Sequence, residues 1–417
     1  MHFHHVDNPP PAAFRETLAD RIVNLIPPRY QYRGNMAPPS TASGYFQESY
    51  DLRIAELAEE RAQGKKIVGT FCLYVPDEII FAAGADRIVL CGGRADTIAP
   101  AEQMLPRNIC PLIKSSFGAI LDSRAGGTAS CPHVRLVDAV VAEATCDGKK
   151  KMYELLPEYV PTYVIDLPQK PGSPEAAAYF LAELRKFGKF MEDLTGNRIR
   201  PGDLQREIAS ANETRKLLHR LFARRKRDPP PIRGSEILRI MQRQFFLSPD
   251  RFRTGLRQLC EELDHASTPA RTGPRILIAG CPMAAGNTKV ADILEQKGAA
   301  IVVEESCTGT RAFWDLVDES TDPWAALAER YLRIPCACMT PNDERISRIL
   351  DLAKEYAVDG VVYYTLQFCH AYNIERLRVQ KALKKEKIPM LAIESDYGDA
   401  DAEQIGIRID AFLEMVS

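Results

Sequence analysis

The sequence predicts an α/β protein made of two Rossmann-like parallel-sheet domains with a helical connecting region between them. Strand candidates alternate with helices near both ends of the chain, and this alternation is typical of parallel βαβ units. Residues 173–266 contain helix patterns and no strand candidate. Residues 67–72 (IVGTFC) also resemble residues 276–281 (ILIAGC), which indicates that one structural unit occurs twice.

The chain of 417 residues is long for one domain, since domains usually span about 100–200 residues. We expect four parts, in chain order: an N-terminal wrapping segment 1–43, a first α/β domain 44–168, a helical connector 169–272 and a second α/β domain 273–417. The wrapping segment is expected to be irregular because it is rich in proline.

The first domain is expected to begin with a helix over residues 46–63. Its strands are expected at residues 67–71, 88–90, 138–142 and 163–167. Pro76 opens a helix between the first two strands, Gly84 closes it, and another helix begins near Cys146. The second domain repeats the pattern, with strands expected at residues 275–279, 300–303, 360–364 and 390–393 and helices between and after them.

The connector is expected to consist of four helices. Ser173 is a good helix start, Gly196 is a good stop, and three more amphipathic stretches follow, broken by proline-containing turns at 229–231 and 248–250. The basic run at residues 224–227 ends one of these helices, where cations suit the dipole. We expect a solvated helix end there rather than an anion site.

Composition excludes several classes of partner. The formal net charge is −2, with 26% charged and 45% hydrophobic residues, so neither nucleic acid nor a membrane is an expected partner. The longest apolar runs are far shorter than the roughly 20 residues of a membrane span. The first residues lack the basic and apolar regions of a signal peptide, so we expect a cytoplasmic protein.

Eleven cysteines are the first specific signal, because a reducing cytoplasm leaves packing, catalysis or metal binding as their uses. Ligands of open α/β sheets bind beyond the carboxyl ends of the strands. Most of the cysteines fall on that rim: Cys72, Cys91, Cys281, Cys307 and Cys369 follow strands, and Cys146 precedes a helix. Cys260 is interpreted as a packing residue instead. The positions therefore indicate a site at this rim, and the expected fold places a metal cluster in the cleft between the two domains.

The spacing leaves the metal open at this point. No compact CxxCxxC run and no CxxC pair occurs, so distant segments must assemble the site. Zinc is an alternative because the Cys336-Ala337-Cys338 pair and Cys369-His370 offer suitable ligands, but iron–sulfur is favoured. Helix starts expected after Cys146 and Cys338 would favour thiolates.

Several longer segments together resemble the 2-hydroxyacyl-CoA dehydratase and benzoyl-CoA reductase subunit family, from about Gly44 to the C-terminus. They are residues 75–84, 106–116 (PRNICPLIKSS), 145–151 (TCDGKKK), 359–370 and 394–397 (ESDY). In this family three cysteines hold one [4Fe–4S] cubane in each subunit, and by motif they fall on Cys110, Cys146 and Cys369.

The remaining cysteines make the chain most similar to the double-cubane branch of the family. Its members are homodimers in which six cysteines hold an [8Fe–9S] cluster. For the second cubane the expected ligands are Cys307, Cys336 and Cys338, with Cys281 and Cys72 in reserve. The alternative is a single [4Fe–4S] cluster.

The resemblance also implies a partner and a reaction. Members receive low-potential electrons from an ATP-hydrolysing [4Fe–4S] activator, and this chain has no P-loop of its own. We therefore expect a reductase of small molecules. One alternative is a dehydratase subunit acting on a 2-hydroxyacyl-CoA, and another is a non-catalytic electron-relay protein. The substrate, and whether CoA thioesters bind, stay open.

Charged side chains near these cysteines suggest further roles. His370 could donate protons at the cluster, or could simply bond to the backbone. Lys114, Lys149 and Lys150 could offset the negative charge of the cluster, or could lie on solvated helix faces. Three strand-end carboxylates could be general acids if burial raises their pKa, although exposed ones are commoner. They are Glu304, Glu305 and Glu394.

Overall fold

The computed structural model describes residues 41–125, 132–266 and 273–417, and it contains two four-stranded sheets. The predicted wrapping segment, residues 1–43, therefore lies outside the described residues except for its last three. The predicted α/β class is confirmed, because both sheets are parallel and helices connect their strands.

The first sheet has the strand order β2-β1-β3-β4, and all of its pairs are parallel. Its strands are β1 (Ile67–Thr70), β2 (Asp86–Val89), β3 (Ala139–Glu143) and β4 (Thr162–Ile165). The helices of this half are α3 (Ala42–Ala62), α4 (Asp77–Ala82), α5 (Ile98–Ala101), α6 (Pro111–Arg124) and α7 (Asp147–Tyr153). Every residue of β1 and β3 is buried, as in parallel sheets covered on both faces.

The second sheet has the order β6-β5-β7-β8, which is the same topology as that of the first sheet. Its strands are β5 (Arg275–Gly280), β6 (Ala300–Glu305), β7 (Gly360–Leu366) and β8 (Met390–Ser395). The helices of this half are α12 (Lys289–Gln296), α13 (Pro323–Leu332), α14 (Asp343–Glu355), α15 (His370–Lys385) and α16 (Ala402–Val416). The repeated topology agrees with the resemblance between residues 67–72 and 276–281.

The predicted strands are all present, and none of their ends differs by more than two residues. The first helix begins earlier than expected, at Ala42 rather than at residue 46, because the Thr41 side chain accepts a hydrogen bond from the Gly44 amide. The helix of residues 111–124 was not predicted, although Pro111 suits a first helical turn.

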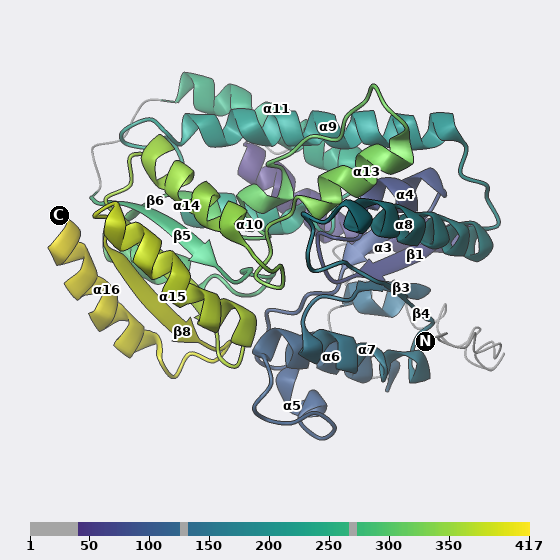
Figure 1. The fold of residues 1–417 in the computed structure, drawn as a ribbon, viewed down its shortest axis with the longest axis horizontal. Coiled ribbons are helices and arrows are strands. Elements are labelled where there is room, and N and C mark those ends of the chain that lie inside the picture. Colours follow the sequence, from purple (N-terminus) through teal and green to yellow (C-terminus); the bar gives the residue numbers. More distant parts are fainter. Residues whose placement is uncertain (1–40, 126–131, 267–272) are drawn as a thin grey trace.

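Four helices form the connector, as predicted: α8 (Pro174–Thr195), α9 (Pro201–Arg224), α10 (Gly234–Arg243) and α11 (Pro249–His265). Ser173 caps α8 by accepting from the Ala176 amide, and Gly196 ends it in the left-handed conformation with φ of 78°. The long helices α9 and α11 pack together along one side of the molecule (Figure 1).

One helix of the second half packs into the first half. Helix α13 lies between β6 and β7 in the chain, yet it contacts α8. Its Leu327 and Tyr331 belong to the same buried cluster as Val68 of β1 and Phe180 of α8. The second half of the chain is therefore interlocked with the first.

A buried ionic group fixes this crossing. The Glu78 carboxylate of α4 accepts hydrogen bonds from Arg215 of α9 at 2.7 Å and from the Tyr331 hydroxyl of α13 at 2.6 Å. The guanidinium of Arg215, with the Tyr331 hydroxyl, overcomes the effect of burial and lowers the pKa of Glu78. One charged carboxylate thus joins the first half, the connector and the second half.

The basic run at 224–227 ends α9 as predicted, but its expected solvation is wrong for Arg225. This residue is fully buried and binds both carboxylate oxygens of Glu304 at 2.6 Å. Its guanidinium also lies 4.8 Å from the centre of the Phe222 ring. Lys226 behaves as expected, since it pairs with Glu355 at the surface.

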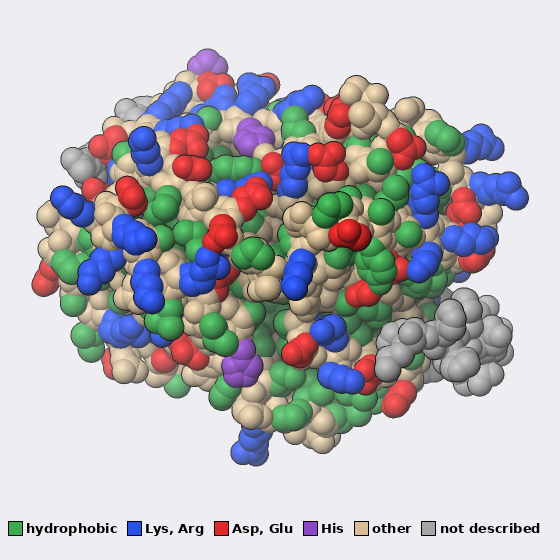
Figure 2. All heavy atoms as spheres, viewed as in Figure 1, with side chains coloured by type: hydrophobic (Ala, Val, Ile, Leu, Met, Phe, Trp, Pro, Cys, Tyr) green, Lys and Arg blue, Asp and Glu red, His purple; other side chains and the backbone are tan. Residues whose placement is uncertain are grey.

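The surface carries both signs of charge. Acidic and basic side chains are interspersed over the face shown in Figure 2, in keeping with the net charge of −2. Within the described ranges, no helix combines the length and the apolar character needed to cross a membrane.

The buried pair of Arg225 and Glu304 yields a first prediction. Arg225→Met leaves Glu304 buried without its cation, so the free energy of unfolding should fall by about 3–5 kcal/mol. Lys226→Met, in the adjacent exposed pair, is the control and should cost less than about 1 kcal/mol. Urea unfolding followed by circular dichroism measures both. Equal losses in the two variants would contradict the assignment of a buried pair.

His133 predicts a pH dependence of stability. It is 4% exposed, and burial, followed by the charges of Arg53 and Arg243, lowers its pKa to about 3. The unfolded chain binds this proton near pH 6.5, so stability falls as pH falls below that value. His133→Phe keeps a ring against Tyr50 and Phe246 and removes this effect. Between pH 7 and 5 the unmodified protein should lose about 2 kcal/mol more than the variant.

The control for this comparison is His265→Gln, at an exposed helix end. It should follow the pH dependence of the unmodified protein in urea unfolding. Parallel curves for His133→Phe and the unmodified protein would show that His133 takes up no extra proton on unfolding.

Candidate functional site

Nine of the ten cysteines in the described ranges line one cavity of about 490 Å³. They are Cys72, Cys91, Cys110, Cys146, Cys281, Cys307, Cys336, Cys338 and Cys369. The structure therefore brings together all six ligands expected from the sequence, and both reserve cysteines. The tenth, Cys260, is buried in α11 away from the cavity, while Cys131 lies outside the described residues.

The repeated topology places six of these cysteines in equivalent pairs at the carboxyl ends of strands. Cys72 follows β1 and Cys281 follows β5, and these are the matching strands of the two sheets. In the same way Cys91 and Cys307 follow β2 and β6, and Cys146 and Cys369 follow β3 and β7. The remaining three lie in equivalent connections, Cys110 between β2 and β3, and the Cys336–Cys338 pair between β6 and β7.

Three cysteines stand at the N-caps of helices: Cys110 before α6, Cys146 before α7 and Cys369 before α15. The free amides and the dipole of a helix start favour a thiolate at this position. The predicted start after Cys146 is confirmed. The one after Cys338 is wrong, because α14 begins at Asp343, with Asn342 as its cap.

Burial and mutual contact oppose ionisation of these thiols. A hydrogen bond with Cys369, followed by burial, raises the pKa of Cys110, and the bond between Cys72 and Cys307 raises the pKa of Cys72. The bond with Cys336 does the same to Cys338. Several adjacent thiols can all lose their protons only where positive charge replaces those protons, as it does at a bound metal.

Two thiols have a lowered pKa instead. The bond with Cys72, and then the nearby Arg311 guanidinium, lower the pKa of Cys307 against the effect of burial. The bond with Cys338, the charge of Arg311 and the Tyr372 hydroxyl lower the pKa of Cys336 to about 5. In each of these two pairs one thiol is therefore the easier to ionise, while its partner, Cys72 or Cys338, keeps its proton more firmly.

The three candidate lysines differ in position. Lys149 lines the cavity and pairs at 2.7 Å with Glu143, whose side chain is fully buried. The charge of Glu143 raises the pKa of Lys149 although burial opposes it. Lys114 pairs with Glu102 at 2.8 Å, and Lys150 pairs with Asp147 on the outer side of α7, where it is 41% exposed. Only Lys149 of the three lines the cavity.

The other candidates from the sequence differ in exposure and in their partners. His370 begins α15, is exposed and lies at the cavity wall. Glu304 and Glu305 are 1% exposed and form buried ion pairs, Glu304 with Arg225 and Glu305 with Arg311 and Arg345, so the expectation of exposed carboxylates is wrong for both. Glu394 is exposed as expected. None of these three carboxylates is part of the cavity wall.

Three buried residues of the site were missed by the sequence reasoning: Glu143, Arg311 and Tyr372. Each stands three or four positions from a rim cysteine, Glu143 before Cys146, Arg311 after Cys307 and Tyr372 after Cys369. This nearness in sequence is the only signal that could have drawn attention to them.

The residues present fit an iron–sulfur cluster. Cysteine thiolates are the usual ligands of such clusters, and the cavity offers nine of them with Lys149 and Arg311 close by. In the described parts of the chain, no three side chains of His, Cys, Asp or Glu gather about a single ion position. The thiols instead surround a larger space.

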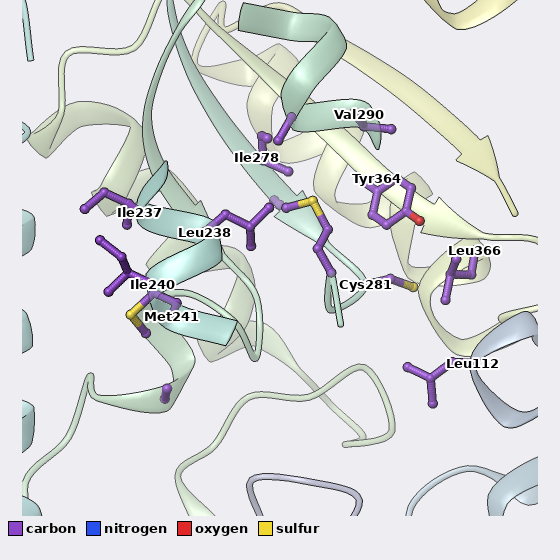
Figure 3. Close-up of a cluster of buried hydrophobic side chains, with 14 of the residues drawn as sticks. Leu112, Ile237, Leu238, Ile240, Met241, Ile278, Cys281, Val290, Tyr364 and Leu366 are labelled. Atoms are coloured by element: carbon purple, nitrogen blue, oxygen red, sulfur yellow. The ribbon is translucent and has the colours of Figure 1, made fainter. Parts of the chain in front are cut away.

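A glycine shapes the second-sheet side of this space. Gly280 ends β5 with φ of 126°, and a Cβ atom there would lie 2.0 Å from the Tyr364 carbonyl oxygen. The backbone can therefore turn against β7 only with glycine. Figure 3 shows the outcome: Cys281 lies beside Tyr364 and Leu366 of β7, and Leu112 of α6 faces it from the other half.

Comparison with known proteins identifies relatives along almost the whole chain. Residues 72–416 match the family model of the 2-hydroxyglutaryl-CoA dehydratase D-component. A putative dehydratase subunit YjiM of Escherichia coli is 37% identical, over 89% of this chain and 97% of its own length. The (R)-phenyllactyl-CoA dehydratase beta subunit of Clostridium sporogenes is 24% identical, over 84% and 92%. A benzoyl-CoA reductase subunit of Thauera aromatica is 22% identical, over 87% and 94%.

The contact between the two halves at the cavity predicts the effect of a methyl group. Gly93 follows β2, and a Cβ atom there would lie 2.7 Å from the Ala285 carbonyl oxygen, in the loop after β5. Gly93→Ala should lower the free energy of unfolding by about 1–3 kcal/mol, since both neighbours are backbone. Gly202→Ala in α9, with no atom within 4 Å, is the control and should be neutral or slightly stabilising. Thermal unfolding measures both, and an unaffected Gly93→Ala variant would show that the loops are not in contact.

Proposed function

The chain belongs to the 2-hydroxyglutaryl-CoA dehydratase D-component family, and from this we propose that it is an iron–sulfur reductase with a double-cubane [8Fe–9S] cluster. The proposed ligands are Cys110, Cys146 and Cys369 for one cubane and Cys307, Cys336 and Cys338 for the other. The observation that supports this best is the single cavity lined by nine cysteines from both halves of the chain.

The number of thiols favours two cubanes over one. A [4Fe–4S] cluster uses at most four cysteines, so one cubane would leave at least five thiols of the cavity without a role, whereas two cubanes held by six cysteines leave three. Cys281 and Cys72 remain in reserve, because both also line the cavity.

A bound cluster would supply the electrons for reduction of a small molecule, and the chain would supply its surroundings. The thiolates hold the irons, and the cations of Lys149 and Arg311 offset part of their negative charge. Apolar residues such as Phe71 and Leu366 contribute to the cavity wall and exclude water there. To His370, which is exposed at the wall, we assign the transfer of protons from solvent to the cluster.

Family components work with an ATP-dependent activator, and we propose that an ATP-hydrolysing [4Fe–4S] protein fills this role here. The proposal that the chain forms a homodimer rests on its resemblance to double-cubane proteins. Cysteine ligands that must stay reduced suit a reducing compartment, so we place the protein in the cytoplasm.

A second function is favoured by the names of several relatives. The proteins that are 24%, 21% and 23% identical are the beta subunits of phenyllactyl-, 2-hydroxyglutaryl- and lactoyl-CoA dehydratases. On that model the chain is a single-[4Fe–4S] subunit that removes a 2-hydroxyl group from an acyl-CoA. A non-catalytic electron relay is the third candidate.

Metal content separates these candidates. Protein purified without oxygen should contain about eight irons per chain with acid-labile sulfide, whereas a single cubane gives about four. Cys307→Ser should halve the iron, because it removes one ligand of the second cubane. Cys260→Ser, outside the cavity, is the control and should keep all of it. Zinc in place of iron, or unchanged iron in Cys307→Ser, would contradict the proposal.

A further inference from the structure

We propose that Arg311 and Tyr372 are positioning residues whose hydrogen bonds to the sulfurs of Cys307 and Cys336 set the reduction potential of the cluster held there. The proposal rests on the proposed function, since it assumes that these two cysteines are ligands. It gives a role in electron transfer to two buried polar residues that the sequence did not single out.

Arg311 is fixed from several sides. Its Nη1 atom lies 3.7 Å from the Cys307 sulfur and also donates to the Tyr372 hydroxyl. Its Nη2 atom donates to the carbonyl oxygens of Gly280 at 2.6 Å and of Glu305 at 3.1 Å. The residue is 3% exposed, so the guanidinium cannot swing away into solvent.

Tyr372 extends this arrangement to the second thiol. Its hydroxyl oxygen lies 3.7 Å from the Cys336 sulfur and accepts the hydrogen bond from Arg311. With that lone pair occupied, the hydroxyl proton is free to point at the sulfur, and a cysteine thiolate can act only as the acceptor. Arg311 and Tyr372 thus form a chain of donors that ends on two proposed ligands.

The rest of the group holds the donors in place and balances their charge. Glu305 lies 2.7 Å from Arg311 and 2.8 Å from Arg345, and Arg345 also pairs with Glu375. Asn342 joins Glu375 at 2.6 Å to the Cys336 carbonyl at 3.0 Å. Two carboxylates balance two guanidiniums, so at the sulfur the directed hydrogen bond adds to what remains of the charge of Arg311.

Such bonds favour the reduced state of a cluster. Reduction adds negative charge that is shared with the sulfurs, and hydrogen bonds to an anion are the stronger ones. Cys110 lies in a different environment, in which Cys369 and the backbone amides of Leu112 and Ile113 are its hydrogen-bond partners. Removal of a donor to Cys307 or Cys336 should therefore make the cluster harder to reduce.

The test compares two tyrosines of the same buried group. Tyr372→Phe removes one hydroxyl, which contacts Cys336, and should leave the iron content unchanged while moving the midpoint potential to a more negative value. Tyr363→Phe is the control, because its hydroxyl bonds to Arg345 at 3.1 Å and to the Tyr372 carbonyl at 3.3 Å. It should keep the potential of the unmodified protein. Iron analysis and a dye-mediated redox titration followed by electron paramagnetic resonance give the readouts.

Arg311→Lys provides a second, independent variant, which keeps the charge but loses the fork of donors. It should also move the potential to a more negative value, and it decides the question if Tyr372→Phe fails to fold or to bind iron. Unchanged potentials at full iron content, or equal shifts in both tyrosine variants, would overturn the proposal. Absence of iron from the unmodified protein would instead reject the proposed function, and this inference with it.

Discussion

The arrangement of this molecule depends on the crowding of thiols where two parallel sheets present their carboxyl ends. Neighbouring thiols and burial raise the pKa of Cys110, Cys72 and Cys338, so the cavity by itself opposes ionisation of all its thiols. Positive charge must compensate for the lost protons. The buried cations Lys149 and Arg311 supply part of it, and their own burial is tolerable only because Glu143 and Glu305 pair with them.

Repetition of one structural unit explains how such crowding arises from an ordinary fold. Each sheet places a cysteine after three matching strands, and the two rims contribute to one cavity. The repeat is not exact. Apart from the cysteines that directly follow β2 and β6, the connection between β6 and β7 places two cysteines at the cavity, Cys336 and Cys338, where the described part of the equivalent connection between β2 and β3 places one, Cys110. The buried donors Arg311 and Tyr372 also belong to the second half, so a symmetrical framework carries an asymmetrical electrostatic environment.

The strands, the rim cysteines and the repeat could be predicted from sequence, because they follow from local apolar pattern and from the rule that parallel strands end at one edge. Buried ion pairs could not. Arg225 lies in a basic run that is typical of solvated helix ends, and its partner Glu304 is 79 residues away. Only the tertiary packing of the end of α9 beside β6 brings the two together. The surroundings of Cys336 could not be predicted either, since its hydrogen-bond partner Tyr372 is 36 residues away in the chain.

The passage of α13 through the first half has a mechanical consequence. The chain leaves β6, packs Leu327 and Tyr331 into the core beside β1, and returns to Cys336, after Tyr74 has bonded the Ile334 carbonyl at 2.5 Å. These side chains bury apolar surface that holds α13 against the first half. Any rotation of one sheet relative to the other would therefore have to bend the segments on both sides of α13, the second of which carries Cys336 and Cys338.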